Sequence, residues 1–151
     1  MASYQEMDDE TYFKELVKYR NSGVNHFASY VDIEITDAGL GWSKGEVVLQ
    51  DHHFNPIGSV HGGLLFALAD SVGGSAACTR RRPVCTLNSE ISYLNAAMDT
   101  KKLVAEAHEV KAGKKTCVYQ VDIFNDSGVL LVTSIMTYFY LHGEIHFPGA
   151  D

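Results

Sequence analysis

Residues 61–78 form the most apolar stretch of this 151-residue chain, and Asp70 is the one charged residue within it. Leucine, valine and alanine recur there at spacings of three and four residues, which predicts a helix. The other positions are also small or apolar, and a helix that is apolar on all sides is buried. The chain must therefore fold around this helix, and Asp70 must be neutral, paired or functional inside it. A structural pair with a distant arginine is the alternative to a functional acid.

A loop of sequence Asn-Pro-Ile-Gly-Ser-Val-His-Gly-Gly leads into the helix at residues 55–63. The Asn-Pro pair and the glycine after it are typical of irregular structure. The first N–H groups of a helix have no acceptor within it, so Gly62 and Gly63 offer free donors at the positive end of the helix dipole. Such donors suit a developing oxyanion. Gly73 and Gly74 each weaken the helix by about 1 kcal/mol relative to alanine, which indicates close approach of a backbone or ligand.

The composition is that of a single globular domain. Hydrophobic residues make up 46% and charged residues 21% of the chain, as in ordinary soluble proteins, and 151 residues allow one sizeable core. The formal net charge of −7 argues against nucleic acid as a partner, because such binding needs a basic surface. The polar residues and glycines within residues 61–78 argue against a membrane span. The three cysteines have no metal-like spacing, and no signal segment opens the chain. We therefore predict a cytoplasmic protein with reduced thiols.

The residues before the loop predict a short helix and two strands. Residues 9–20 carry an amphipathic stripe, with acids at the start and Lys18 and Arg20 near the end, as the helix dipole favours. From Tyr30 the period changes to two. This pattern predicts a strand at residues 30–36, a turn at 37–41 and a second strand at 45–50.

Four further strands are predicted after the helix, at residues 87–93, 102–110, 117–124 and 130–141. In the first of them, Leu87, Ser89, Ile91 and Tyr93 share one face. The last is apolar on both faces, which predicts that it is covered on both sides. Short turns at residues 111–115 and 125–128 imply antiparallel pairing. We therefore predict an α+β fold in which one curved antiparallel sheet of six strands wraps the central helix.

This element order, together with two motifs, resembles the hotdog fold, and more narrowly the phenylacetate-degradation type of acyl-CoA thioesterases. The first motif is Asn-Pro-x-Gly-x-x-His-Gly-Gly at residues 55–63, followed by Asp70 on the helix. The second, Tyr-Leu-Asn-Ala-Ala at residues 93–97, is similar to the family's Tyr-x-x-Pro-Ala, with Ala96 where the family often has proline. We expect one hotdog domain over residues 1–151: a helix and lead-in at 1–27, the core at 28–141 and a tail at 142–151.

The resemblance implies roles for five residues. Asp70 matches the catalytic acid, which acts as nucleophile or general base, and the N–H of Gly62 matches the group that polarises the thioester carbonyl. Asn55 matches a side chain that holds the attacking water or orients the carbonyl. His61 matches a histidine that lies near the leaving sulfur or supports the turn, and Thr86 matches a hydroxyl that assists in some members. The family needs no cofactor beyond the coenzyme A of the substrate.

Substrate contacts are expected from Gly63 and Phe66 at the start of the helix. Coenzyme A would also bring several negative charges, which basic clusters bind through charge-assisted hydrogen bonds. Two clusters are candidates: Arg80, Arg81 and Arg82 after the helix, and Lys111, Lys114 and Lys115 on a turn. The alternative for the arginines is a structural role at the helix C-terminus, and turn lysines are commonly just solvated.

No metal site is predicted. His52 and His53 are adjacent, and on an extended chain their side chains diverge. His142 and His146 have the spacing of a helical metal site, but a glycine and a proline argue against a helix there.

Hydrolysis of acyl-CoA thioesters is the function that we predict. A thiolate is a good leaving group, so the site needs an oxyanion donor and either a base or a nucleophile, and Asp70 can serve as either. Two alternatives remain: hydration or dehydration of hydroxyacyl thioesters on the same fold, and a non-catalytic acyl-CoA-binding module. The hydratases typically begin the helix with a Pro-Gly pattern, and a binding module would usually carry a further domain.

The partner that we predict is a second copy of the chain. The helix face that holds Phe66, Ala67, Gly73, Gly74 and Ala77 should not meet water, and one sheet covers only one face of a helix. The resemblance implies the same, a homodimer that pairs into a homotetramer. In that arrangement the loop and helix start of one chain meet Asp70 of the other.

Overall fold

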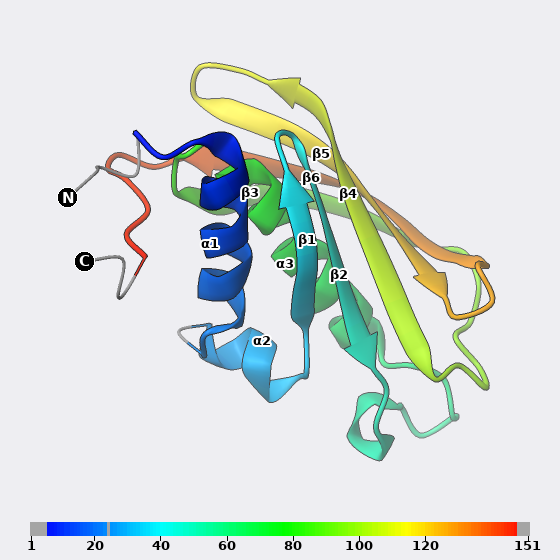
Figure 1. The fold of residues 1–151 in the computed structure, drawn as a ribbon. Coiled ribbons are helices and arrows are strands. Elements are labelled where there is room, and N and C mark those ends of the chain that lie inside the picture. Colours follow the sequence, from blue (N-terminus) through cyan, green and yellow to red (C-terminus); the bar gives the residue numbers. More distant parts are fainter. Residues whose placement is uncertain (1–5, 24, 148–151) are drawn as a thin grey trace.

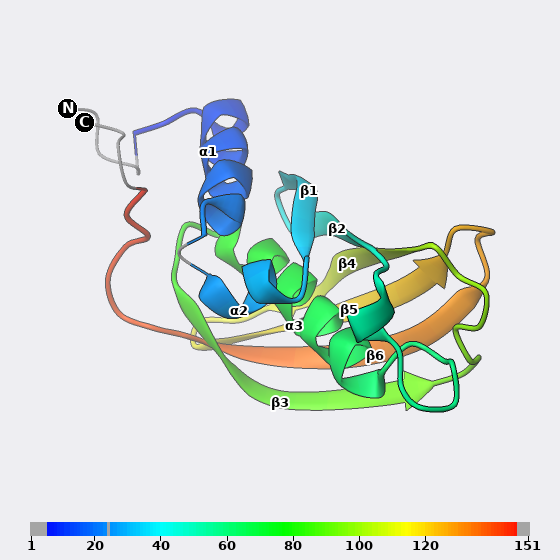
Figure 2. The same cartoon turned by 90° about the horizontal axis from the view of Figure 1, so that it is seen from below.

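A six-stranded antiparallel sheet and one long helix, α3 (Gly62–Cys78), make up the two layers of the fold (Figure 1). The computed structural model describes residues 6–23 and 25–147. The strand order in the sheet is β1-β2-β4-β5-β6-β3, and the sheet curves around α3, which lies across its concave face (Figure 2). The predicted α+β architecture is therefore confirmed.

Helix α3 begins and ends where the sequence predicts. His61 is the N-cap, and its Nδ1 accepts a hydrogen bond from the Gly63 N–H at 2.9 Å, which satisfies one of the donors that a helix start leaves open. At the other end the Thr79 N–H donates to the Ala76 carbonyl at 3.1 Å. Eleven of the 17 residues are buried, which agrees with the apolar character of the sequence.

The core lies between α3 and the inward faces of the strands. On β4 (Lys102–Ala112) every second side chain from Leu103 to Ala107 is buried, and on β5 (Thr116–Asn125) every second side chain from Cys117 to Ile123 is buried. Each fully buried valine or leucine stabilises the fold by roughly 1.5–3 kcal/mol relative to exposure. A Cβ on Gly45 of β2 (Trp42–Val48) would lie 2.7 Å from Cγ2 of Val72, so glycine there lets the helix approach the sheet closely.

The first strand begins later than predicted, because residues 26–30 form a short helix. Helix α2 (His26–Tyr30) is held by Asn25, whose side chain accepts from the Ala28 N–H at 3.3 Å. Strand β1 (Glu34–Gly39) follows and extends through residues 37–39, which the sequence had assigned to the turn. A 3-10 turn, η1 (Asp51–His53), then connects β2 to the loop before α3.

Strand β3 (Val84–Tyr93) contains a bulge between Thr86 and Asn88 that changes which side chains share a face. Thr86 pairs with Tyr138 and Ser89 pairs with Met136 on β6 (Leu130–Tyr140). Residues opposite one another point to the same side of a sheet, so the bulge brings Thr86 to the helix side and leaves Leu87 60% exposed. The prediction that Leu87 shares the face of Ser89 is therefore wrong.

Strand β6 is buried on one face rather than two. Along its second half, buried side chains alternate with side chains that are partly buried or exposed. Ile135 and Phe139 on the outer face are partly exposed in this chain. The sequence prediction of burial on both sides is wrong, because within the described residues only the inner face meets the helix layer.

The two sheet edges differ. Helix α1 (Asp9–Asn21) packs beside β1, and the Asn21 amide pairs with both the N–H and the carbonyl of Ile35, at 2.9 and 2.7 Å. The β3 edge has no such cover from the part of the chain that the structure describes. An uncovered edge is a template for pairing with another chain.

Helix α1 also corrects the predicted open face of α3. Gly73, Gly74 and Ala77 are buried within this chain, because α1 and the sheet cover them, whereas Phe66 and Ala67 are half-buried. The predicted tail packs on α1 at Phe147, whose ring lies 5.5 Å from that of Tyr12. Residues 148–151 of that tail lie outside the described residues. None of the described helices is long and apolar enough to cross a membrane.

Candidate functional site

Two hydroxyl groups from different strands hold the carboxylate of Asp70. The Thr86 hydroxyl donates to Oδ1 at 2.8 Å. The Tyr138 hydroxyl lies 3.4 Å from the same oxygen and 3.1 Å from the Asp70 carbonyl. Both therefore act on Oδ1, and Oδ2 has no hydrogen-bond partner within residues 6–23 and 25–147. The described residues place no arginine in an ion pair with Asp70, so the structural-pair alternative gains no support.

Tyr138 is a residue that the sequence analysis missed, because it lies in a strand interpreted only as apolar core. Burial raises the pKa of this phenol well above its usual range, and the nearby negative charge of Asp70 raises it further. Tyr138 therefore stays protonated and can donate. A Cβ at Gly73 would overlap the Tyr138 hydroxyl, which accounts for the close approach that the glycine had indicated.

The start of α3 offers one open backbone donor. The Gly63 N–H is occupied by His61, and the Leu64 N–H donates to the His61 carbonyl at 3.0 Å. The Gly62 N–H has no acceptor within the described chain. The Tyr93 hydroxyl donates to the Gly62 carbonyl at 3.0 Å, and its ring lies over the glycine. His61 thus supports the turn, as one of its two predicted roles requires.

Asn55 shapes the loop before the helix. Its side-chain oxygen accepts from the N–H groups of Ile57 and Ser59, each at 3.1 Å, and its own N–H donates to the Ser59 carbonyl at 2.8 Å. The oxygen is therefore committed to the loop, and the amide nitrogen is the part of the side chain left for a substrate or a water. The sequence motif alone did not distinguish the two ends of the amide.

The structure brings the predicted site residues together as two separate groups. Thr86 joins Asp70, and His61 joins Gly62 beside the loop of Asn55. Asp70 follows Gly62 by eight positions on one helix, and a helix rises 1.5 Å per residue, so the groups are about 12 Å apart along the axis. One carbonyl carbon cannot contact both groups in a single chain.

Two cavities flank the outward face of α3. The larger, about 610 Å³, lies at the helix start and has mostly apolar walls. Its lining is Phe27, Tyr30, Val31, His52, His53, His61, Gly63, Leu64 and Ala67. The smaller, about 240 Å³, lies beside Asp70. Its lining is Arg20, Asn25, Phe27, Asp70, Ser71, Gly74, Val84, Cys85, Thr86 and Tyr138. Gly63 thus lines the larger cavity, and the predicted contact Phe66 lines neither.

The three arginines after α3 have partners within the chain. Arg80 forms a two-point pair with Glu109, at 2.6 and 2.9 Å, and this pair lowers the pKa of the Glu109 carboxyl. Arg81 donates to Asp9 at 2.9 Å, and Arg82 lies 4.1 Å from the ring centre of Tyr140. These contacts favour the structural alternative for the cluster.

The three lysines form no ion pair with an acid of the described chain. Their predicted contact with coenzyme A is therefore still open, and Lys111, Lys114 and Lys115 are all exposed.

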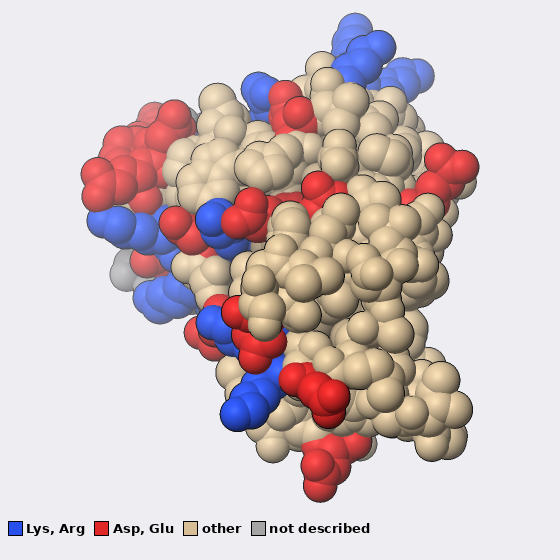
Figure 3. Space-filling model, turned by 90° about the vertical axis from the view of Figure 1, so that its right-hand side faces the viewer, with Lys and Arg blue, Asp and Glu red and all other residues tan. Residues whose placement is uncertain are grey.

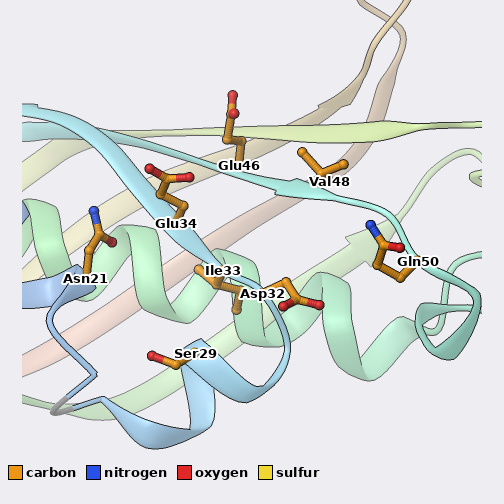
Figure 4. Close-up of a pocket in the computed structure, with 8 residues that line it drawn as sticks. All are labelled: Asn21, Ser29, Asp32, Ile33, Glu34, Glu46, Val48 and Gln50. Carbon is orange, nitrogen blue, oxygen red and sulfur yellow. The ribbon is translucent and has the colours of Figure 1, made fainter.

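A further cavity, of about 520 Å³, lies at the β1 edge and is lined partly by acids (Figure 4). Asp32 comes from the turn before β1, Glu34 from β1 and Glu46 from β2. Lys102 already contacts Glu46 at 3.1 Å. Solvated acids at a sheet edge do not by themselves make a binding site, and Asp70 is not part of this cavity.

His52 and His53 lie together rather than diverging, because they stand on the 3-10 turn η1. Their ring centres are 4.1 Å apart, and both Nε2 atoms approach Oδ2 of Asp32, at 3.1 and 3.3 Å. His53 Nδ1 accepts from the Gln50 N–H at 2.9 Å, so the proton of the neutral ring is on Nε2. Burial lowers the pKa of His53, which keeps the ring neutral. A protonated Nε2 does not fit a metal ligand, and the cluster instead braces the turn before β1.

Comparisons with known proteins agree with the motif positions. The sequence model of the Thioesterase superfamily matches residues 57–132, which include Gly62, Asp70 and Thr86. A curated Archaeoglobus fulgidus protein with an esterase name is 34% identical over 101 residues, which cover 67% of this chain and 66% of that protein. The chain thus spans just under two thirds of that relative. Human acyl-coenzyme A thioesterase 13 is 30% identical over 114 residues, which cover 74% of this chain and 81% of that enzyme.

Solved structures share the fold. The PaaI protein of the Escherichia coli phenylacetic acid degradation operon superposes with a TM-score of 0.81 over 88% of this chain and 98% of that one, at 21% identity. A hypothetical thioesterase of Streptococcus pneumoniae, solved with coenzyme A, superposes with a TM-score of 0.72 at 30% identity, over 80% of this chain and 96% of that one. Sequence and fold agree, and this chain belongs to the Thioesterase superfamily, with the hotdog fold that its motifs resemble.

Proposed function

We propose that this protein hydrolyses acyl-CoA thioesters to the free acid and coenzyme A, with Asp70 as the acid that acts on the thioester. The observation that carries the proposal is the carboxylate held at Oδ1 by Thr86 and Tyr138, with Oδ2 left for chemistry. Family membership supports the reaction class. The name of the human relative and the coenzyme A in the S. pneumoniae structure support acyl-CoA as the substrate.

The N–H of Gly62 is the proposed donor to the thioester oxygen. It stands at the positive end of the α3 dipole with no acceptor in the described part of the chain. A fixed donor aimed at a developing oxyanion gains strength where water is excluded. The amide nitrogen of Asn55, whose oxygen is committed to its loop, then holds the carbonyl or the attacking water.

Asp70 and Gly62 of the same chain are about 12 Å apart by helix geometry, so the proposed site needs a second copy. In the proposed homodimer, Gly62 and Asn55 of one chain meet Asp70 of the other. The long uncovered edge of β3 supports this arrangement. The end of β3 and the nearby loops also expose large apolar side chains, at Ile57, Tyr93, Leu94 and Met98. Figure 3 shows a broad surface without Lys, Arg, Asp or Glu on the side that faces right in Figure 1, and the core of a protein interface is depleted of charged residues.

Two chemical routes are open to the Asp70 carboxylate. As a general base it takes a proton from water, which attacks the carbonyl carbon and expels the thiolate. As a nucleophile it forms a mixed anhydride, which water then splits. Hydrolysis in ¹⁸O-labelled water under single-turnover conditions distinguishes them, because only the anhydride route can leave label in the Asp70 side chain.

A panel of acyl-CoA substrates with a thiol reagent tests the function. Release of free coenzyme A is the expected result. A change in enoyl absorbance without release of the thiol would indicate hydration or dehydration, and binding without either change would indicate a ligand-binding module. Both of these outcomes would contradict the proposal.

A further inference from the structure

Arg20 reaches from α1 into the cavity beside Asp70. Its Nε donates to the Ser75 hydroxyl at 2.8 Å, and Nη2 donates to the Ser71 carbonyl at 3.1 Å. A Cβ at Gly74 would lie 3.4 Å from Nη2, so glycine leaves the space in which the guanidinium lies against α3. These contacts fix the position of the cation, and both acceptors are neutral.

Arg20 differs from the other three arginines of the chain. Each of those meets an acid or an aromatic ring in the protein. Arg20 is partly buried, and no acid within residues 6–23 and 25–147 lies within ion-pair distance of it. Its third nitrogen, Nη1, likewise has no acceptor in the described residues. A partly buried cation that is held only by neutral acceptors is better stabilised when an anion joins it, so Arg20 offers a binding point for an anion from outside this fold.

The cavity places that anion close to the proposed reaction centre. Arg20, Asp70, Thr86 and Tyr138 all line it. Burial is the main cause of the raised pKa of Tyr138; the Asp70 carboxylate raises this pKa further and the Arg20 guanidinium lowers it, so both charges act on the same hydroxyl. The volume, about 240 Å³, is below the range of roughly 300–1,000 Å³ typical of pockets for drug-sized ligands. The part of the site that this chain lines thus has room for a short acyl chain.

We propose that this cavity receives an acyl group that ends in a second carboxylate, and that Arg20 binds this carboxylate. The substrate class would be short carboxyacyl thioesters, and the inference rests on the proposed thioesterase function. A coenzyme A phosphate is also an anion and could bind an arginine. However, the long pantetheine arm separates the phosphates from the sulfur and therefore from the reacting carbonyl. A group inside a cavity lined by Asp70 lies next to the reacting carbonyl, which favours the acyl carboxylate.

The first experiment compares glutaryl-CoA with pentanoyl-CoA, which have acyl chains of equal length and differ in the terminal carboxylate. The wild-type protein is expected to show a kcat/KM at least tenfold higher for glutaryl-CoA. This is the effect expected from the stabilisation that one charge-assisted hydrogen bond contributes. Arg20→Gln should lower the glutaryl-to-pentanoyl ratio at least tenfold, mostly through KM, and Arg20→Lys should retain part of it. Lys18→Gln is the matched control, because it removes an exposed cation from the same helix and should leave the ratio unchanged.

The second experiment changes the thiol part of the substrate, here called the carrier. Glutarate and pentanoate are supplied as N-acetylcysteamine thioesters, and this carrier contains no phosphate. If Arg20 binds the acyl carboxylate, Arg20→Gln lowers the ratio with either carrier. If Arg20→Gln weakens both coenzyme A thioesters equally and spares the N-acetylcysteamine thioesters, the anion is a phosphate and the proposal is wrong.

Calorimetry with the free acids separates this inference from the proposed function. Glutarate should bind the wild-type protein more tightly than pentanoate does, and Arg20→Gln should remove the difference. Glutarate binding without cleavage of any thioester would contradict the proposed function and support the anion site. Equal binding of the two acids would overturn the anion site whatever the enzyme hydrolyses.

Discussion

The start and the middle of α3 carry the two halves of the proposed site, and they are built in different ways. At the start, the groups come from one short segment, residues 55–62: the loop at Asn55, the cap at His61 and the N–H of Gly62. In the middle, Asp70 depends on side chains from two strands, Thr86 and Tyr138. A backbone donor at a helix start follows from local sequence, whereas a positioned carboxylate needs the completed tertiary fold.

Removing the carboxylate from the middle of α3 should have the largest effect. Asp70→Asn keeps the shape of the side chain and an oxygen for Thr86, but it can act neither as base nor as nucleophile. We expect kcat to fall by about 10²–10⁴-fold, measured as release of coenzyme A, with unchanged circular dichroism. Activity within about threefold of wild type, less than 1 kcal/mol of barrier, would remove Asp70 from the mechanism.

Removing the donor from the start of α3 should be almost as costly. Gly62→Pro deletes the open N–H at the first helical position, where proline is tolerated. We expect kcat to fall by about 10²–10³-fold, as for other oxyanion donors, with a smaller change in KM. Gly62→Ala is the control, because it keeps the N–H and its Cβ would meet Tyr93 at an ordinary 3.5 Å. A rise in KM alone for the proline variant would refute the oxyanion role.

Mixing two inactive variants tests whether the two halves come from different chains. Asn55→Ala and Asp70→Asn are unfolded and refolded together, so half of the dimers are mixed. In a site shared across a two-fold axis, each mixed dimer has one intact site, and about a quarter of wild-type activity returns. If mass spectrometry finds mixed dimers and no activity returns, the site lies within one chain.

The hydroxyls around Asp70 should show the smallest effects, and in a defined order. Thr86→Val removes the 2.8 Å hydrogen bond to Oδ1, and we expect kcat to fall about tenfold, as for one hydrogen bond to a charged group. Tyr138→Phe should cost less, about threefold, because its contact with Oδ1 is longer at 3.4 Å and long hydrogen bonds are weak. Steady-state rates measure both, and the reverse order would show that Tyr138 rather than Thr86 orients the carboxylate.

Sequence by itself determined the features that neighbouring residues control. The apolar period and the glycines at its start predicted the bounds of α3, and Asn- or glycine-containing turns separated most of the strands. The superfamily was also readable, because its motif lies in one loop and one helix at residues 55–70. For the site residues, sequence supplied identities and implied roles, which stay predictions.

Only the tertiary structure decided how distant residues meet. The bulge at Leu87 turned Thr86 toward Asp70. A regular two-residue alternation would have placed Thr86 on the opposite face of the strand, so the sequence pattern did not predict this contact. The sequence predicted an extended chain at His52 and His53, with diverging side chains. In the structure these residues stand on a 3-10 turn, which brings their rings together. Arg20, assigned to a helix dipole from its sequence position, lies beside Asp70 because α1 packs against α3. Periodicity and capping act within a few residues of the chain, whereas these contacts depend on packing between segments far apart in sequence.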